Sequence, residues 1–390
     1  MNTHLSRILA LFLLFICSVS AQLKAQDDSA YTTAVRLYES QNYSEALDMF
    51  QECLEQDSTQ FKCFEKAGLS AYRLGDVPKA KKLFLDLLEK DSSNTIALSQ
   101  LSTIFEQEKN TPKAIKYYSH LNKLFPENPI YLRKLGQQYQ SAGLLTEAFT
   151  HYSEALNLNG RDMFTIKGIV EIFLSNRQYV EADSMLFVGL ELDSMNINFN
   201  LLMAQSKYRQ KAFDSTVHYL ERIRYEIDFS PYFNKLFGYS YIQIDSFEKS
   251  IPLLEKALMD EGNKEYAHYY LATAYEKLDS QDYALHHYNK ALEEGISDNV
   301  DLYHRNLAKI YNEKSELKEA IPHYQDAYKY GKDPNVLFYL ARAADVYYKD
   351  KNIALNYYKR YIKLGDNEDY VRYSRERRRY ILEQLHFENN

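Results

Sequence analysis

Residues 129–162 read PIYLRKLGQQYQSAGLLTEAFTHYSEALNLNGRD, and the pattern of large and small residues in this stretch recurs along the chain. Its anchor is Ala148, which has equivalents every 34 residues and, after one step of 36, two more. A fixed period of this length is typical of one supersecondary unit stacked repeatedly, because a single copy cannot bury its apolar face alone. The anchors are Ala46, Ala80, Ala114, Ala148, Ala182, Thr216, Ser250, Ala284, Ala320 and Ala354.

Each period contains two helical stripes. A large residue such as Tyr152 follows the anchor by four positions, and Ala155 comes three positions later, so both lie on the anchor's helix face. Upstream, the large-then-small pair Leu135 and Gly136 precedes the aromatic Tyr139 and marks a second helix. A small residue opposite a large one lets two helices approach closely without leaving a void. We therefore expect one helical hairpin in each period.

These residues resemble the tetratricopeptide repeat family, whose unit is a helix-turn-helix of 34 residues. The resemblance covers about residues 27–366 and implies an all-α, right-handed α-solenoid of about ten repeats. The fourth copy fits best, with Leu132, Leu135, Gly136, Tyr139, Ala148, Tyr152 and Ala155 in place. The ten copies are expected to begin near Asp27, Phe61, Thr95, Pro129, Met163, Ile197, Pro231, Glu265, Asp301 and Asn335.

Two copies depart from the pattern. The sixth has Lys207 where an aromatic is expected, and the tenth fits better when its first helix is slipped by one residue to use Leu340, Ala341 and Ala344. The family's tryptophan is absent throughout, because the chain contains none. Its column holds polar residues at Asn200, Asn234, His268 and His304.

The carboxyl-terminal segment, residues 367–390, is predicted to cap the array. Asp369 to Phe387 has the spacing of one more helix and carries many charges, including a run of arginines. The terminal repeats of a solenoid need a polar outer face. We interpret the arginines as a solvated cap face, and the alternative is a docking site for an acidic partner. No linker interrupts the array, so one elongated helical solenoid is expected.

The amino-terminal residues have the composition of a secretory signal. Arg7 precedes an apolar run from Ile8 to Val19, and small residues follow at Ala21 and Ala25. The run is short for a membrane-spanning helix, so residues 1–21 are predicted to be removed, with cleavage as late as residue 25. We expect an exported chain, periplasmic or associated with the cell envelope, with no transmembrane segment after cleavage. A retained anchor is the alternative.

The cysteines leave two questions open. Cys17 is a poor lipid-attachment site, because the bulky Phe15 and Ile16 precede it where the bacterial lipoprotein signal has small residues. Cys53 and Cys63 lie on either side of the expected turn between the first two copies, so a disulfide between them is geometrically possible and an exported compartment would permit it. Alternatively, both are small buried apolar residues.

Charge and motifs argue against several functions. Removal of the leader with its one basic residue leaves 46 basic and 54 acidic side chains, a formal charge of −8, which disfavours nucleic-acid binding. The histidines have no partner at a metal-binding spacing on one helix face, so no metal or other cofactor is expected. Two serine-lysine tetrads, beginning at Ser246 and Ser315, fall in turns where serine caps helices. We therefore expect no catalytic residues and no enzyme activity.

The resemblance places a binding groove on the concave side of the array, formed by the first helices. Carried over position by position, it predicts a groove rich in tyrosine with interspersed cations, suited to extended peptides or sugar rings. The family's carboxylate clamp is not satisfied by Lys235 with Tyr239 or by Arg133 with Gln137. The partner-binding candidates are Arg133, Gln137, Gln140, Lys167, Tyr232, Lys235, Tyr239, Tyr266, Tyr269, Arg305, Lys309 and Asn312.

The sequence thus predicts a non-enzymatic scaffold of a bacterial cell envelope that holds a protein or an extended peptide along this groove. Its bacterial origin rests on the resemblance, because exported members of the family are common in bacterial envelopes. An alternative is recognition of a carbohydrate or of the cell wall within an assembly or uptake machine, which the same tyrosines would serve. A hidden hydrolase activity has the least support.

Overall fold

The structure is a computed structural model that describes residues 30–57, 59–259, 264–295 and 298–388. The predicted leader and its cleavage sites lie outside these residues. Every regular element in the described ranges is a helix, so the predicted all-α class is confirmed. None of the helices in these ranges has the length and apolar character that crossing a membrane requires.

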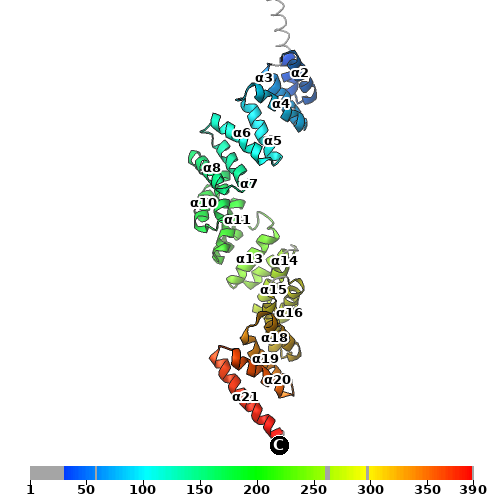
Figure 1. The fold of residues 1–390 in the computed structure, drawn as a ribbon, viewed down its shortest axis with the longest axis vertical. Coiled ribbons are helices and arrows are strands. Elements are labelled where there is room, and N and C mark those ends of the chain that lie inside the picture. The colour runs from blue at the N-terminus through cyan, green and yellow to red at the C-terminus, as the bar shows by residue number, and fades with distance from the viewer. Residues whose placement is uncertain (1–29, 58, 260–263, 296–297, 389–390) are drawn as a thin grey trace, which may run out of the picture. The chain divides into compact units, whose positions relative to one another are not determined.

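The helices form antiparallel pairs that follow one another in sequence order (Figure 1). The chain divides into two compact units, the first ending at Leu192 and the second beginning at Asp193. The first unit contains a helix over residues 30–39, α2 (Tyr43–Gln56), α3 (Phe61–Arg73), α4 (Val77–Lys90), α5 (Thr95–Gln107), α6 (Thr111–Leu124), α7 (Pro129–Ser141), α8 (Leu145–Leu158), α9 (Met163–Ser175) and α10 (Tyr179–Leu192).

The second unit contains five further pairs and a terminal helix. These are α11 (Ile197–Arg209), α12 (Phe213–Arg222), α13 (Pro231–Gln243), α14 (Phe247–Ala257), α15 (Lys264–Lys277), α16 (Gln281–Glu294), α17 (Val300–Glu313), α18 (Leu317–Gly331), α19 (Pro334–Tyr347), α20 (Lys351–Leu364) and α21 (Glu368–Glu388). The first helices of the pairs from α3 to α13 begin at the residues where the copies were expected to begin, and α15, α17 and α19 begin one residue earlier.

The small anchors and the large residues four positions later form the core of both units. All ten anchors are fully buried, including Thr216 and Ser250. Close packing of small against large residues is clearest at Tyr152, whose ring lies against Gly136 on its own hairpin and against Gly168 on α9. A Cβ atom built on Gly136 would lie 2.6 Å from the ring, and one built on Gly168 would lie 2.5 Å from it. The ring therefore fixes the spacing of α7, α8 and α9.

The turn inside most hairpins has a residue in the left-handed region at a fixed position. These residues have φ between 56° and 81° and recur every 34 residues up to Asp279. Glycine, which adopts this conformation at no steric cost, occupies only two of the positions. The series is Gln41, Gly75, Lys109, Gly143, Arg177, Lys211, Asp245, Asp279 and Ser315.

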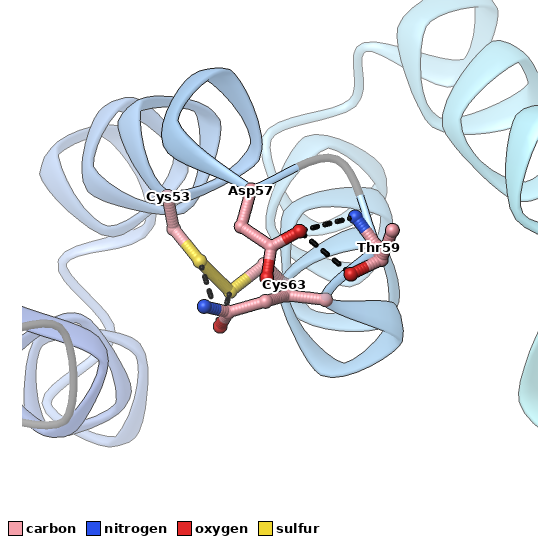
Figure 2. Close-up of a disulfide and its surroundings, with 5 residues drawn as sticks. Cys53, Asp57, Thr59 and Cys63 are labelled. Carbon is pink, nitrogen blue, oxygen red and sulfur yellow. Dashed lines mark hydrogen bonds between the residues drawn. A yellow bond between two sulfur atoms is a disulfide. The ribbon is translucent and has the colours of Figure 1, made fainter. Parts of the chain in front are cut away.

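A disulfide joins the first two hairpins. Cys53 on α2 and Cys63 on α3 are bonded, with their Cα atoms 6.4 Å apart (Figure 2). The amide end of Gln60 lies 3.3 Å from Cys53 Sγ and 3.5 Å from Cys63 Sγ. The connecting turn is held by Asp57, whose carboxylate accepts hydrogen bonds from the backbone N–H and the hydroxyl of Thr59. These hydrogen bonds lower the pKa of Asp57.

The sixth and tenth copies explain why their sequences fit the pattern poorly. In the sixth, α12 spans only ten residues, and Asn200 fills the tryptophan column by donating its side-chain amide to the backbone carbonyls of Ser194 and Asn196. In the tenth, Leu340 and Ala341 are buried, in agreement with the slipped register.

Helix α21 packs on the last hairpin through few side chains. Its buried residues are Ser374 and Ile381, whereas Tyr373 and Tyr380 remain 43% and 49% exposed. The Arg377 guanidinium donates to the buried carboxylate of Asp345 on α19, with Nε and Oδ2 2.6 Å apart. This ion pair and Ile381 attach the charged helix to the core, which agrees with a cap.

Candidate binding surface on the first helices

The largest hollow among the first helices lies near the carboxyl-terminal end of the second unit. It has a volume of about 840 Å³ and is lined by α17, α19 and the residues that begin α21, with Tyr324 of α18 at its floor. We call it the terminal pocket. Its lining residues are Arg305, Asn306, Lys309, Asn312, Glu313, Tyr324, Asp333, Asn335, Val336, Tyr339, Arg342, Asp366, Asn367 and Tyr370.

Two of the three cations in the terminal pocket are engaged by the protein itself. Arg305 lies 3.4 Å from carboxylate oxygens of both Asp301 and Asp333, so it links α17 to the residue that caps α19. Lys309 Nζ lies 2.7 Å from Glu276 Oε1, and this hydrogen bond raises the pKa of the lysine. These side chains join neighbouring hairpins, so an incoming anion would compete with carboxylates already in place.

Arg342 is the cation in the terminal pocket without such a partner. Its guanidinium lies over the rings of Phe338 and Tyr373, 5.7 and 5.8 Å from their centroids. Among the described residues, no carboxylate forms an ion pair with it. Stacking on aromatic rings orients a guanidinium while leaving its N–H groups free to donate. Arg342 can therefore bind a carboxylate or another anionic group of a ligand.

Neutral hydrogen-bonding groups complete the terminal pocket. The hydroxyls of Tyr339 and Tyr370 lie 3.0 Å apart, and this contact, with burial, raises the pKa of Tyr339 to about 12. The side-chain amides of Asn306 and Asn312 have no hydrogen-bond partner within the described ranges. An amide offers both a donor and an acceptor, which matches the peptide backbone. The arrangement suits an extended polar chain with one negative group.

A second hollow lies on α13, α15 and α17, and we call it the tyrosine pocket. It has a volume of about 270 Å³ and includes Tyr239, Tyr266, Tyr269 and Tyr270 in its lining. The rings of Tyr239 and Tyr270 are 4.6 Å apart, and burial raises the pKa of both hydroxyls. These tyrosines are therefore neutral at pH 7 and present ring faces together with hydroxyl groups.

The candidates in the first unit form a polar chain between two helices. Arg133 Nη1 on α7 lies 3.0 Å from Asp162, the residue that caps α9. Further along α7, Gln140 accepts a hydrogen bond from the Tyr152 hydroxyl and donates one to Glu171 on α9. Lys167 lies 3.5 Å from the same carboxylate, and Gln137 is half-buried on α7.

The structure thus sorts the predicted residues into groups. Arg305, Lys309 and Asn312 lie together in the terminal pocket, and Tyr239, Tyr266 and Tyr269 lie together in the tyrosine pocket. Lys235 lies beside the latter, with Nζ 5.9 Å from the centre of the Tyr266 ring, and Tyr232 packs on Phe233. The prediction missed Asn306, Tyr339, Arg342, Asn367 and Tyr370.

A signal for part of the missed set was present. The one-residue slip of the tenth first helix moves the exposed positions of α19, and following it would have selected Tyr339 and Arg342. The contribution of Asn367 and Tyr370 could not be read from the repeat, because α21 is not part of it.

Known proteins resemble the chain at the level of family and fold. Residues 65–129 match the tetratricopeptide repeat family, and no curated protein matches. A tetratricopeptide repeat protein from Parabacteroides merdae is 14% identical, with a TM-score of 0.46 over 64% of this chain and 98% of its own. YrrB, described as a TPR protein with an unusual peptide-binding site, is 16% identical, with a TM-score of 0.42 over 46% and 92%. PilF of Pseudomonas aeruginosa is 15% identical, with a TM-score of 0.42 over 56% and 96%.

The matched segment begins within α3 and ends at the first residue of α7. The same anchors and the same hairpin recur on both sides of it. These observations support the tetratricopeptide repeat family for this chain, a class of stacked helical hairpins that generally serve as non-catalytic scaffolds for protein interactions.

Proposed function

We propose that this protein is a non-enzymatic scaffold that binds an extended segment of a partner protein, with the terminal pocket as its main anchoring site. The observation that carries the proposal is Arg342, a cation held on two aromatic rings without a carboxylate partner in the described chain, beside the unpaired amides of Asn306 and Asn312. The ligand is an extended peptide with an acidic group that pairs with Arg342 and a backbone that pairs with the amides.

The dimensions of the terminal pocket agree with this ligand. A volume of about 840 Å³ lies in the upper part of the usual range for binding pockets, and four or five peptide residues of ordinary size would fill it. The aromatic rings of Tyr324 and Tyr339, which are 6.2 Å apart, supply apolar contact area at a low cost in side-chain entropy.

Cross-linking in whole cells of the native source, followed by identification of the captured protein, would provide the partner. Its binding is then compared between the wild type and the Arg342→Ala variant. We expect the affinity to fall at least tenfold, because a hydrogen bond to a charged group is lost. The matched control is Arg360→Ala, since Arg360 is also exposed and also lies over a tyrosine ring, Tyr328, but belongs to the second helix α20.

Equal affinity of the Arg342→Ala variant and the wild type, with the helical spectrum unchanged, would contradict the terminal pocket as the anchoring site. An equal loss in the Arg360→Ala control would show that only overall charge matters. Repeating the comparison with a high-salt buffer measures that nonspecific contribution directly.

A carbohydrate ligand is the second candidate, favoured by the adjacent ring faces and hydroxyls of the tyrosine pocket. Binding to a glycan array that is lost in the Tyr239→Ala variant and retained in Arg342→Ala would support it. The two candidates thus depend on different pockets and are separated by these two variants.

We further propose that the scaffold is exported to a bacterial cell envelope. Two features support this location: the composition of residues 1–21 and the disulfide between Cys53 and Cys63, since disulfides persist in oxidising compartments. Cell fractionation and sequencing of the mature amino terminus test it. A full-length chain recovered from the cytoplasm would contradict the proposal.

A further inference from the structure

Two histidine pairs lie inside consecutive hairpins of the second unit, away from both pockets. In the first, His268 on α15 and His287 on α16 have their Nδ1 atoms 3.0 Å apart. In the second, His304 on α17 and His323 on α18 have their Nδ1 atoms 2.8 Å apart. The two pairs are related by the 36-residue step of the repeat, so each hairpin brings together the same two positions.

Aromatic rings orient the members of each pair. His287 stacks on Tyr275, with ring centroids 5.5 Å apart and planes 4° from parallel. In the next hairpin His323 stacks on Tyr311 in the same way, with centroids 5.6 Å apart and an interplanar angle of 10°. His304 also stacks on Tyr330. Because these contacts restrict the rotation of the imidazoles, their nitrogens face each other before any ligand arrives.

The nitrogen separations match those of two adjacent ligands on one metal ion. With metal–nitrogen bonds of about 2.0–2.1 Å, two imidazoles at 90° place their nitrogens about 2.9 Å apart, and two at the tetrahedral angle place them about 3.3 Å apart. The observed 3.0 and 2.8 Å agree with the 90° arrangement. Square-planar or tetragonal coordination by nitrogen and oxygen is typical of Cu²⁺ and Ni²⁺.

We propose that the pairs His268–His287 and His304–His323 are two equivalent binding sites for a divalent transition-metal ion of the Cu²⁺ type. The described residues supply no third protein ligand at either pair, so water completes the coordination and the sites are open to exchange. In the metal-free pair one ring donates its Nδ1 proton to the other ring. On binding, that proton moves through solvent to Nε2 of the same ring, and both Nδ1 lone pairs reach the metal without net proton release.

The surroundings keep the imidazoles neutral, as metal ligation requires. Burial lowers the pKa of all four, that of His287 to about 4. Around the first pair, Glu293 and Glu294 act against this effect while His286 and Lys290 add to it. Around the second pair, Asp326 acts against it and Lys329 adds to it. Metal binding is therefore expected to persist at pH 5.5, where ordinary histidines are mostly protonated.

The test is a Cu²⁺ titration of the tag-free full chain at pH 7 and pH 5.5, in the presence of excess Mg²⁺, which prefers oxygen ligands and does not compete. Bound copper is measured by calorimetry and by electron paramagnetic resonance, in which nitrogen hyperfine structure identifies imidazole ligands. The double variant His268→Gln/His304→Gln should bind two Cu²⁺ ions fewer than the wild type, and each single variant one fewer. The matched control is His286→Gln, which removes a neighbouring histidine outside the pairs.

The variant His287→Gln/His323→Gln, which removes the opposite member of each pair, should show the same loss and serves if the first variant does not fold. A folded double variant that binds as much copper as the wild type would overturn the proposal. Loss of the same copper in the His286→Gln control would also overturn it, because it would assign the sites to the surface histidine. Since no residue of the two pockets is changed, failure here leaves the peptide-binding proposal untouched.

Discussion

At the scale of single residues, the clearest determinant of the structure is the contact between large and small side chains. Tyr152 illustrates it, because its ring occupies space that a methyl group on either Gly136 or Gly168 would fill. The ring is almost fully buried, and its hydroxyl still reaches Gln140. Glycine is conserved here by geometry alone, since no other residue type fits against the ring without displacing it.

Replacing either of these glycines should therefore destabilise the protein. Alanine is the better helix former by about 1 kcal/mol. Even so, Gly136→Ala and Gly168→Ala should each lower the free energy of unfolding by about 1–2 kcal/mol, because overpacking outweighs that gain. Urea denaturation followed by circular dichroism measures the change. Gly160→Ala is the control, since the nearest atom to its added Cβ is 3.7 Å away, and an equal effect there would refute the packing argument.

The residue scale also shows what the sequence could and could not predict. The ten anchors are recognisable because burial of a small residue leaves a periodic trace in one dimension. The histidine pairs leave no such trace, because His268 and His287 lie on different helices and meet only through the geometry of the hairpin. A search along one helix face, which is how metal-ligand spacing is usually read, misses them.

At the scale of elements, the hairpin is the unit, and most contacts between hairpins are made by neighbours. The disulfide is an exception in kind, because it links α2 covalently to α3 and so joins two successive hairpins. Asp345 and Arg377 do the same for α19 and α21 by an ion pair. Each end of the array is thus reinforced where a stacking neighbour exists on one side only.

Reduction of the disulfide should weaken the first unit. Closing a loop of about ten residues is expected to stabilise the folded state by roughly 2–3 kcal/mol through the entropy of the unfolded chain. Dithiothreitol should therefore lower the urea midpoint of the wild type. The Cys53→Ala/Cys63→Ala variant is the control and should not respond to dithiothreitol, and an unchanged midpoint in the wild type would contradict the prediction.

At the scale of the whole molecule, stability should differ from one hairpin to the next. In stacked repeats, stability is a sum of contributions from single units and from their interfaces with neighbours. Helix α12 has only ten residues, and residues 225–230 contain no helix before α13 begins. This hairpin also belongs to the copy with the weakest match to the repeat, next to the division between the two units.

We therefore expect local opening to concentrate at α12. Its amide hydrogens should exchange at least tenfold faster than those of α8, a second helix of fourteen residues in a hairpin that fits the repeat well. Hydrogen–deuterium exchange with mass spectrometry, performed on the full chain, measures both helices in one experiment. Uniform protection across the two would show that the array unfolds as a single cooperative unit.

Most of the fold follows from periodicity, whereas the terminal pocket depends on features outside it. The starts of the hairpins could be placed within one residue because proline, asparagine and aspartate mark helix starts in each copy. Arg342 belongs to a slipped copy, and Tyr370 belongs to a helix that the repeat does not contain. A pocket formed where the repeat ends is for that reason the part of the surface that repeat analysis predicts least well.

The left-handed turn positions have a practical consequence. Seven of the nine in the series are occupied by side-chain-bearing residues, each held in a conformation that glycine adopts more easily by on the order of 1 kcal/mol. They lie in the turns, remote from the terminal pocket, the tyrosine pocket and the histidine pairs. Introducing glycine at one, then several, of them offers a way to raise the melting temperature in graded steps while leaving every ligand-facing side chain as it is.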